Sequence, residues 1–394
     1  MIGGTAAETA DVIVVGAGVQ GASLAFHLAG RGARVLVVER ETTAAGATGR
    51  SSGFVRMHYD LESDARLAWL SFPYFLDWQG HVGAGDCAFV RTGFLQVFSP
   101  ELADAVAANV ATHQRIGIET RTVTAREVGE LVPGAVLDGI GIGAFEPESG
   151  YADPSGTAAG FLEGARRRGA SYLHGCRVTG VAVEGDRVVG VDSDRGRLAA
   201  PVVVDAAGAW AAALATTAGV DVPVQPWRHD TAFFGLPAGH HPDFPIVIDE
   251  INEVYFRPEG RDLMLVGLEG SSEVGGSPDR PLTADPAGIE DMVRRLVTRV
   301  PWMSEGTLRT AHGGQDGITP DQHPLIGAAG PDGFFLLCGF SGTGFKTAPA
   351  IGACLAELIL DGRTTTADIS GYAPGRFAAG RSLVAAHPYG VLWR

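Results

Sequence analysis

The chain of 394 residues has a formal net charge of −15 and 45% hydrophobic residues, a composition typical of a globular protein with room for two or three domains. The acidic balance argues against nucleic acid or an anionic membrane as a partner. Apolar runs are no longer than strands, residues 1–10 lack the pattern of a secretory signal, and the four cysteines lack metal-binding spacing. We therefore expect a cytoplasmic protein with no membrane span, no disulfide framework and no metal site.

The chain begins with the strand–turn–helix–strand pattern of a dinucleotide-binding unit. A buried strand, Val12–Val15, leads into a G-x-G-x-x-G turn. Gly16 permits the tight turn, Gly18 lets the backbone approach a pyrophosphate, and Gly21 lets the next helix pack close to the strand. A second strand ends in Glu39, where an acidic side chain accepts both ribose hydroxyls. An acid at this position favours FAD or NAD over NADP.

The following 260 residues or so alternate between helices and strands without an internal repeat. Capping and periodicity predict helices over 61–78, 99–115, 125–131, 153–169 and 286–299, with Asp153 as an N-cap and Pro154 in the first helical position. Strands are predicted over 93–98, 177–184, 187–193, 201–205, 231–235, 246–249, 253–257 and 263–268, with a hairpin turn at Gly185-Asp186. The alternation indicates two interleaved domains.

The last third carries the second glycine-rich motif. A strand over 333–338 runs into G-F-S-G-T-G-F-K, which opens a helix through Leu360. The motif ends in Lys346, the only lysine among 30 basic residues. Lysine is a compact ammonium and arginine a planar fork, so a site that needs the former does not always accept the latter. We therefore expect Lys346 to have a functional role.

Three separated segments share one pattern, an apolar strand followed by small residues and a helix: Val12–Gly21, Val202–Trp210 and Phe334–Phe345. Backbone N–H groups at such turns attract phosphates and electron-rich ring edges. A single NAD-binding domain needs only the first segment. The repetition predicts one long cofactor that runs through the whole fold.

The chain resembles the D-amino-acid-oxidase-type FAD oxidoreductases, and it is most similar to their sarcosine and dimethylglycine oxidase/dehydrogenase branch. The matching motifs, in the family's order, are the fingerprint, A-T-G-R-S-S-G-F-V-R, V-V-V-D-A-A-G-A-W, T-P-D-Q-H-P-L-I-G and C-G-F-S-G-T-G-F-K. The resemblance implies a mixed α/β fold: a Rossmann-like FAD-binding domain interleaved with a substrate domain on a largely antiparallel sheet. The implied boundaries are 1–85, 149–218 and 312–370 for FAD, 86–148 and 219–311 for substrate, and 371–394 for a C-terminal tail.

The resemblance also implies the residues that contact FAD. They are Gly16, Gly18, Val19, Gln20, Gly21, Glu39, Arg40, Arg50, Ser51, Ser52, Gly53, Val178, Ala207, Gly208, Trp210, Gly342, Thr343, Gly344, Phe345 and Lys346.

Two cations match the pair that holds the substrate carboxylate in monomeric sarcosine oxidases, Arg56 and Lys346. With the carboxylate fixed, the C–H bond beside the nitrogen can sit near flavin N5 for hydride transfer. Tyr255 matches a cavity tyrosine or is a packed strand aromatic, and His58 either faces the flavin or is a satisfied core histidine. The implied activity is oxidation of the C–N bond of a carboxylate-bearing, secondary amine or amino acid to an imine.

Two positions depart from the family pattern. Gly314 stands where monomeric sarcosine oxidases attach their flavin through a cysteine, so we expect non-covalent FAD, with His312 or another histidine as the remaining route. The oxygen-activating lysine is replaced by Met264 or Val266, depending on a two-residue gap. Developing superoxide needs a nearby positive charge, so we expect a dehydrogenase or a slow oxidase.

Several alternatives remain open from sequence. The chain could be the flavin subunit of a hetero-oligomeric dehydrogenase that passes electrons to a partner, and homo-oligomers are also open. An NAD-dependent dehydrogenase is disfavoured because no second fingerprint exists for a pyridine nucleotide, and a non-enzymatic binding protein is disfavoured by the intact cofactor motifs. The substrate could be sarcosine, a larger secondary amino acid, a cyclic imino acid or a biosynthetic intermediate.

Overall fold

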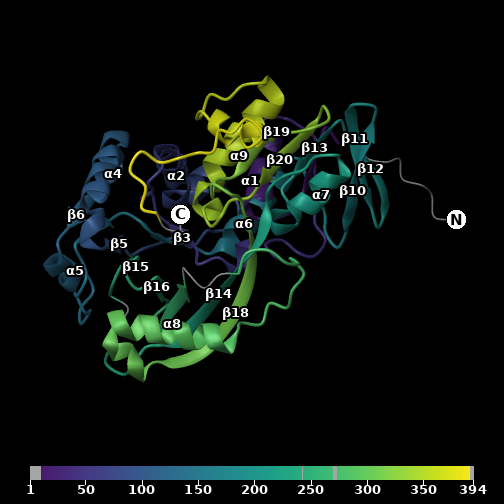
Figure 1. Ribbon diagram of the computed structural model, residues 1–394. Coiled ribbons are helices and arrows are strands. Elements are labelled where there is room, and N and C mark those ends of the chain that lie inside the picture. Colours follow the sequence, from purple (N-terminus) through teal and green to yellow (C-terminus); the bar gives the residue numbers. More distant parts are fainter. Residues whose placement is uncertain (1–9, 242, 269–272, 391–394) are drawn as a thin grey trace.

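A computed structural model describes residues 10–241, 243–268 and 273–390, and two large β-sheets organise them. The first sheet has six strands in the order β19-β20-β13-β1-β2-β9 and lies in the upper part of Figure 1. Its strands are β1 (Val12–Val15), β2 (Val35–Val38), β9 (Ser171–Leu173), β13 (Val202–Asp205), β19 (Leu325–Ala328) and β20 (Phe334–Cys338). All pairs are parallel except β19 with β20. The first two predicted strand–turn segments thus leave the same edge of the sheet, since Val15 pairs with Asp205.

Helices cover this sheet. They are α1 (Val19–Gly30), α2 (Glu62–Leu76), α6 (Pro154–Arg167), α7 (Ala211–Thr217) and α9 (Gly344–Asp361). Helix α1 packs against both α6 and α9, and the Ser23 hydroxyl donates to the Ala348 carbonyl at 2.7 Å. The predicted cap of α6 is confirmed, since the Asp153 side chain accepts from the Ser155 N–H at 2.9 Å and Pro154 opens the helix.

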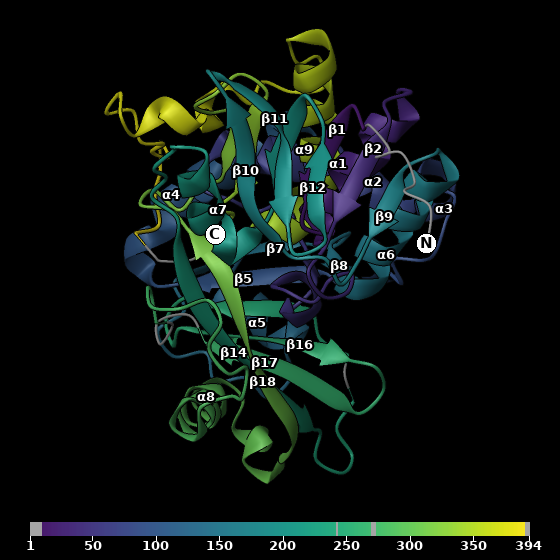
Figure 2. The same cartoon turned by 90° about the vertical axis from the view of Figure 1, so that its right-hand side faces the viewer.

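The second sheet has eight strands in the order β18-β14-β17-β16-β15-β5-β7-β6, and Figure 2 shows β14, β17 and β18 side by side with α8 below them. The strands are β5 (Phe94–Phe98), β6 (Arg121–Val123), β7 (Ile142–Glu146), β14 (Gln225–Gly235), β15 (Ile246–Asp249), β16 (Val254–Glu259), β17 (Leu263–Leu268) and β18 (Thr307–Ile318). Only β5 and β15 pair in parallel, so the sheet is largely antiparallel. Helices α5 (Ala125–Leu131) and α8 (Pro286–Arg299) have the predicted bounds.

Smaller elements complete the fold. They are the sheet of β10 (Val178–Glu184), β11 (Arg187–Ser193) and β12 (Gly196–Ala199), the sheet of β3 (Phe54–Val55), β8 (Gly150–Tyr151) and β4 (Val90–Arg91), and helices α3 (Trp78–His81) and α4 (Ala103–Ile116). The hairpin at Gly185-Asp186 is confirmed, because Glu184 pairs with Arg187. The helix predicted over 61–78 ends at Leu76, and Asp77 caps α3 instead.

After α9, residues 362–390 form no further α-helix or strand, and they pack against the rest of the protein. The Tyr389 ring packs 4.7 Å from the Phe98 ring. Residues 1–9 and 391–394, which the predicted domain ranges include, lie outside the described residues. Among the helices that the structure describes, none has the length and apolarity needed to cross a bilayer.

Candidate active site

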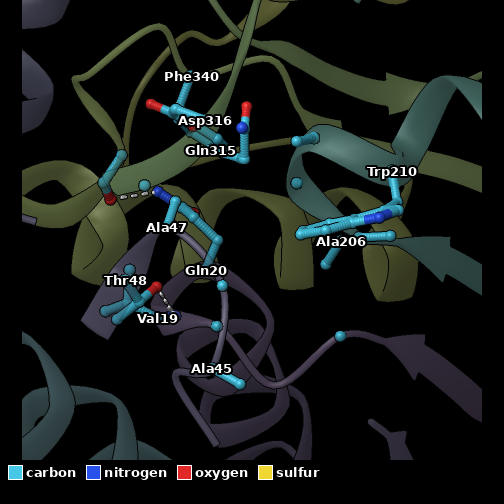
Figure 3. Close-up of a pocket in the computed structure, with 18 of the residues that line it drawn as sticks. Val19, Gln20, Ala45, Ala47, Thr48, Ala206, Trp210, Gln315, Asp316 and Phe340 are labelled. Atoms are coloured by element: carbon cyan, nitrogen blue, oxygen red, sulfur yellow. Dashed lines mark hydrogen bonds between the residues drawn. The ribbon is translucent and has the colours of Figure 1, made fainter. Parts of the chain in front are cut away.

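A cavity of about 400 Å³ lies at the edge where β1 and β13 end, and it extends to the eight-stranded sheet. Most of the predicted FAD contacts line it: Gly16, Gly18, Val19, Gln20, Glu39, Arg40, Arg50, Ser51, Ser52, Val178, Ala207, Gly208, Trp210, Gly342, Gly344 and Phe345. Gly21, Gly53, Thr343 and Lys346 belong to the neighbouring structure but are not lining residues. The three predicted strand–turn–helix segments therefore meet around one space (Figure 3).

The nucleotide turn depends on two glycines. Gly16 has a φ of +110°, and a Cβ there would lie 2.5 Å from the Ala206 carbonyl oxygen. A Cβ at Gly21 would lie 2.1 Å from the Gly16 carbonyl oxygen. Any side chain at either position would push the turn apart, which agrees with the predicted roles of both glycines.

Side chains tie this turn to distant segments, as the dashed lines of Figure 3 show. The Val19 N–H donates to Thr48 Oγ1 at 3.0 Å, and Gln20 Nε2 donates to the Gly344 carbonyl at 2.7 Å. Residues from α1, the 48–50 turn and the start of α9 are thus held in one arrangement around the cavity.

The adenosine end carries an acid and an aromatic–cation pair. The Glu39 carboxylate accepts the Ala17 and Glu41 N–H groups, both at 2.9 Å, so it is fixed at the end of β2. The Arg40 guanidinium lies 3.9 Å from the Trp210 ring centroid. Arg40 and the Trp210 indole N–H both donate to Asp279, at 3.1 and 2.9 Å.

The opposite end is lined by the eight-stranded sheet. His229, Thr231, Tyr255, Gly314, Gln315 and Asp316 contribute from β14, β16 and β18. Burial lowers the pKa of His229 to about 3, so its ring is neutral at physiological pH. Of these residues, sequence reasoning named only Tyr255 as a candidate for the site. Asp316 lies three residues before the T-P-D-Q-H-P-L-I-G motif at 319–327, and that position was the available signal.

The position of Tyr255 is consistent with both predicted roles, a cavity tyrosine and a packed aromatic residue of a strand. It lines the cavity, and its ring also packs edge-on against Phe54 at 5.4 Å. Its phenol lies directly over Gly267, where a Cβ would be 2.1 Å from the Tyr255 oxygen.

Met264 and Val266, the residues expected at the place of the family's oxygen-activating lysine, lie on one side of β17. Met264 and Val266 belong to the core formed with α8, which includes Met292 and Leu296. Side chains alternate along a strand, so Leu265 faces the other way, where it packs with Tyr255. Leu265 and Gly267 are therefore the β17 positions on the side of Tyr255, a lining residue of the cavity, and neither carries a cation.

The structure also bears on flavin attachment. A Cβ at Gly314 would lie 3.1 Å from the Arg50 Cβ, so Arg50 fills the space that a cysteine side chain would need. His312 is not a lining residue of the cavity.

Arg56 and Lys346 meet at one aromatic ring. The Arg56 guanidinium carbon lies 4.3 Å and Lys346 Nζ 5.8 Å from the Tyr59 ring centroid. Their exposed fractions are 3% and 6%, and Lys346 Nζ donates to the Gly342 carbonyl at 3.1 Å. Burial and the neighbouring Arg56 charge lower the pKa of Lys346 well below its usual range. Neither cation is among the residues that line the cavity, although the carbonyl to which Lys346 donates belongs to the lining residue Gly342.

Within the described chain, neither cation has a carboxylate within 4 Å, and Arg56 Nε has no hydrogen-bond partner. A buried charge without a counter-ion is destabilising by several kcal/mol. Arg56 and Lys346 are two buried cations at one aromatic ring, Tyr59.

The structure places His58 in the core, which favours the second of its two predicted roles. It is fully buried, its Nε2 lies 2.7 Å from the Tyr389 hydroxyl, and its ring packs 4.7 Å from His113. It is not among the residues that line the cavity. Burial lowers the pKa of His58 well below its usual range, which leaves a neutral core histidine.

Glu146 is a buried acid that sequence reasoning did not single out. One oxygen accepts the Met57 N–H at 2.9 Å and the Ser149 hydroxyl at 2.6 Å, which holds the backbone beside Arg56. Burial raises the pKa of this carboxyl to about 7.

The cavity fits FAD. One end has the glycine turn and the ribose-binding acid that an ADP moiety requires, and the other end is enclosed by strands that can flank a flat ring. Fold and site thus define a dinucleotide-dependent oxidoreductase. The chain belongs to the FAD dependent oxidoreductase (DAO) family, whose pattern matches residues 11–358.

Individual relatives agree with this assignment. Human mitochondrial sarcosine dehydrogenase is 29% identical over 94% of this chain, and this chain spans 42% of its length. Sarcosine oxidase subunit beta of Rhodobacter capsulatus is 26% identical over 89% of this chain and 85% of its own. The crystal structure of L-proline dehydrogenase from P. horikoshii superposes with a TM-score of 0.88 at 26% identity, covering 96% of this chain and 100% of the other.

Proposed function

We propose that this protein uses non-covalent FAD to oxidise the C–N bond of a carboxylate-bearing amine, in particular a secondary amino acid, to an imine. The observation that carries the proposal is the pair of buried cations at Tyr59, Arg56 and Lys346, neither of which forms an ion pair with a carboxylate within 4 Å in the described structure. A substrate carboxylate would supply the missing charge, and two cations from different elements would fix its orientation.

The residues that would hold FAD are those of the glycine turn, Glu39, the 50–52 loop and the turn before α9. When bound, FAD supplies the acceptor for the two electrons and the hydrogen that leave the substrate carbon. The protein's own part is to bind the carboxylate, hold the amine and exclude water from the enclosed end of the cavity.

We further propose a dehydrogenase or slow oxidase activity, because Leu265 and Gly267 leave no cation on the cavity side of β17. The same observation favours a second candidate function, the flavin subunit of a hetero-oligomer, since a partner could then accept the electrons. The relative from Rhodobacter capsulatus is by name a subunit. We place the protein in the cytoplasm, which the four free, buried cysteines support.

A visible spectrum of the purified protein tests the proposal, recorded before and after anaerobic addition of N-methyl and cyclic amino acids. We expect a flavin spectrum that bleaches with at least one carboxylated amine and recovers slowly in air. Amines of the same shape without the carboxylate are the control and should not bleach it. A flavin that no carboxylated amine reduces, with or without copurified partners, would contradict the proposal.

A further inference from the structure

We infer that Asp316 takes the proton from the substrate ammonium, so that the site binds an amino acid as its zwitterion. This inference rests on the proposed function, and it adds a catalytic residue and a charge requirement to it. Asp316 is a half-buried residue of β18 that lines the cavity.

One glycine connects Asp316 with the proposed carboxylate site. Asp316 Oδ2 accepts the Gly342 N–H at 2.8 Å, and Oδ1 accepts the Gly317 N–H at 2.7 Å. The Lys346 ammonium donates to the carbonyl of the same Gly342 at 3.1 Å. An acid and a cation are thus anchored on the two sides of one residue. An α-amino acid carries its own cation and acid one carbon atom apart, with the complementary arrangement.

Asp316 lies at the end of the cavity where the reaction would occur. The nucleotide turn fixes the ADP moiety at the opposite end, so the flavin ring belongs at the end lined by β14, β16 and β18. Figure 3 shows Asp316 beside Gln315, across the drawn space from Val19 and Thr48. The other lining acids of the described chain, Glu39 and Glu41, are at the adenosine end.

The charged and titratable groups around Asp316 support this role. The Lys346 charge acts on Asp316 from α9. Asp316 pairs with Trp227 on strand β14, and the next residues of that strand are Arg228 and the neutral His229. Arg50 lies against the neighbouring Gly314. Burial raises the pKa of Asp316, while the two backbone N–H groups and Lys346 oppose that rise. A raised pKa makes the carboxylate a better proton acceptor, provided that it is ionised at the working pH.

The proposed step is a single proton transfer from the substrate to Asp316. The N–H bond of the substrate ammonium breaks, its electron pair stays on nitrogen, and an O–H bond forms on Asp316. The freed nitrogen lone pair is what allows the adjacent C–H bond to release hydride. Without the proton acceptor, the enzyme must use the small fraction of substrate that is already neutral in solution.

The test compares kcat/KM of wild type and Asp316→Asn between about pH 6 and about pH 10, with an amine that bleaches the wild-type flavin. We expect Asp316→Asn to lose about 1,000-fold at pH 7, where only about one in 1,000 molecules of an amine with a pKa of about 10 is neutral. Its activity should then rise about tenfold per pH unit and approach wild type near the pKa of the free amine, about 10. Asp316→Glu should keep the wild-type profile shape. A wild-type-to-variant ratio that does not change with pH would overturn the inference.

A binding measurement separates this role from a structural one. Methoxyacetate has the carboxylate of N-methylglycine but neither an ammonium nor a proton to lose. Its Kd, read from the perturbed flavin spectrum, should be the same for wild type and Asp316→Asn. If Asp316→Asn weakens the binding of methoxyacetate by the same factor by which it lowers kcat/KM at pH 7, Asp316 only maintains the Gly342 turn. If wild type itself is reduced by no carboxylated amine, the proposed function fails, whereas a pH-independent ratio counts against Asp316 alone.

Discussion

Lys346 and Arg56 are buried beside an aromatic ring and backbone carbonyls, and neither has a carboxylate within 4 Å in the described chain, so we propose that the substrate supplies their counter-ion. Replacing Lys346 with Met removes the ammonium and keeps a side chain of similar length. A hydrogen bond to a charged group contributes about 1.5–3 kcal/mol, so KM for the carboxylated amine should rise about 10- to 100-fold. Steady-state kinetics measure this rise.

The same variant should not weaken the fold. Because burial of an ammonium without an ion-pair partner within 4 Å is unfavourable, its replacement should leave the free energy of unfolding of the apoprotein unchanged or raise it. Arg126→Met is the matched control, since Arg126 is 81% exposed in a surface ion pair. Unchanged KM in Lys346→Met would contradict the carboxylate site. A large loss of stability would instead assign Lys346 a structural role.

At the scale of elements, the contact between α1 and α9 fixes the geometry of the site, because α1 starts at the nucleotide turn and α9 carries Lys346. The helices approach closely at Gly352, where a Cβ would lie 2.4 Å from Ser23 Oγ and 2.9 Å from the Ser23 carbonyl carbon. Gly352→Ala should therefore lower the free energy of unfolding by about 1–3 kcal/mol, as overpacking of a core does. Urea unfolding of the apoprotein measures the loss.

Helix propensity alone predicts the opposite sign, since Ala is favoured over Gly within a helix by about 1 kcal/mol. The control is Gly375→Ala, an exposed position where no atom lies within 4 Å of an added Cβ. That change should stay within about 0.5 kcal/mol of wild type. A higher free energy of unfolding for Gly352→Ala than for wild type would show that α1 and α9 can move apart without loss of stability.

Elements with strong local signals were predictable from sequence. Helix α8 has its predicted bounds because Asp285, Pro286 and the amphipathic pattern fix them locally. Strand β18 was not predicted, since its sequence T-L-R-T-A-H-G-G-Q-D-G-I has little β propensity and depends on pairing with β14. Asp316 was missed for the same reason. The sequence did not indicate which side of β17 faces α8, because only the packed sheet shows that Met264 does.

At the scale of the whole molecule, we propose that the six-stranded and eight-stranded sheets mark two interleaved domains with FAD between them. Strand β18 continues in the eight-stranded sheet to Ile318, beyond the boundary predicted at residue 312. A strap of residues 273–285, between β17 and α8, crosses from the eight-stranded sheet to the adenosine end. Arg228 holds it by donating to the carbonyls of Pro281 and Thr283, at 3.1 and 2.6 Å.

This strap should slow the release of FAD. Its Asp279 accepts from Arg40 and Trp210, and both of these residues line the cavity. Asp279 is largely exposed, and exposed pairs contribute about 0.2–1 kcal/mol each, so Asp279→Ala should speed FAD dissociation about 2- to 10-fold. The recovery of flavin fluorescence on dilution measures the rate. High salt should bring the FAD dissociation rate of wild type closer to that of the variant, because salt screens the Arg40–Asp279 pair.

The control is Asp221→Ala, at an exposed acid for which no ion pair is found in the described chain. This variant should release FAD at the wild-type rate. Equal release from Asp279→Ala and wild type would mean that the strap lies over the cofactor site without retaining the cofactor.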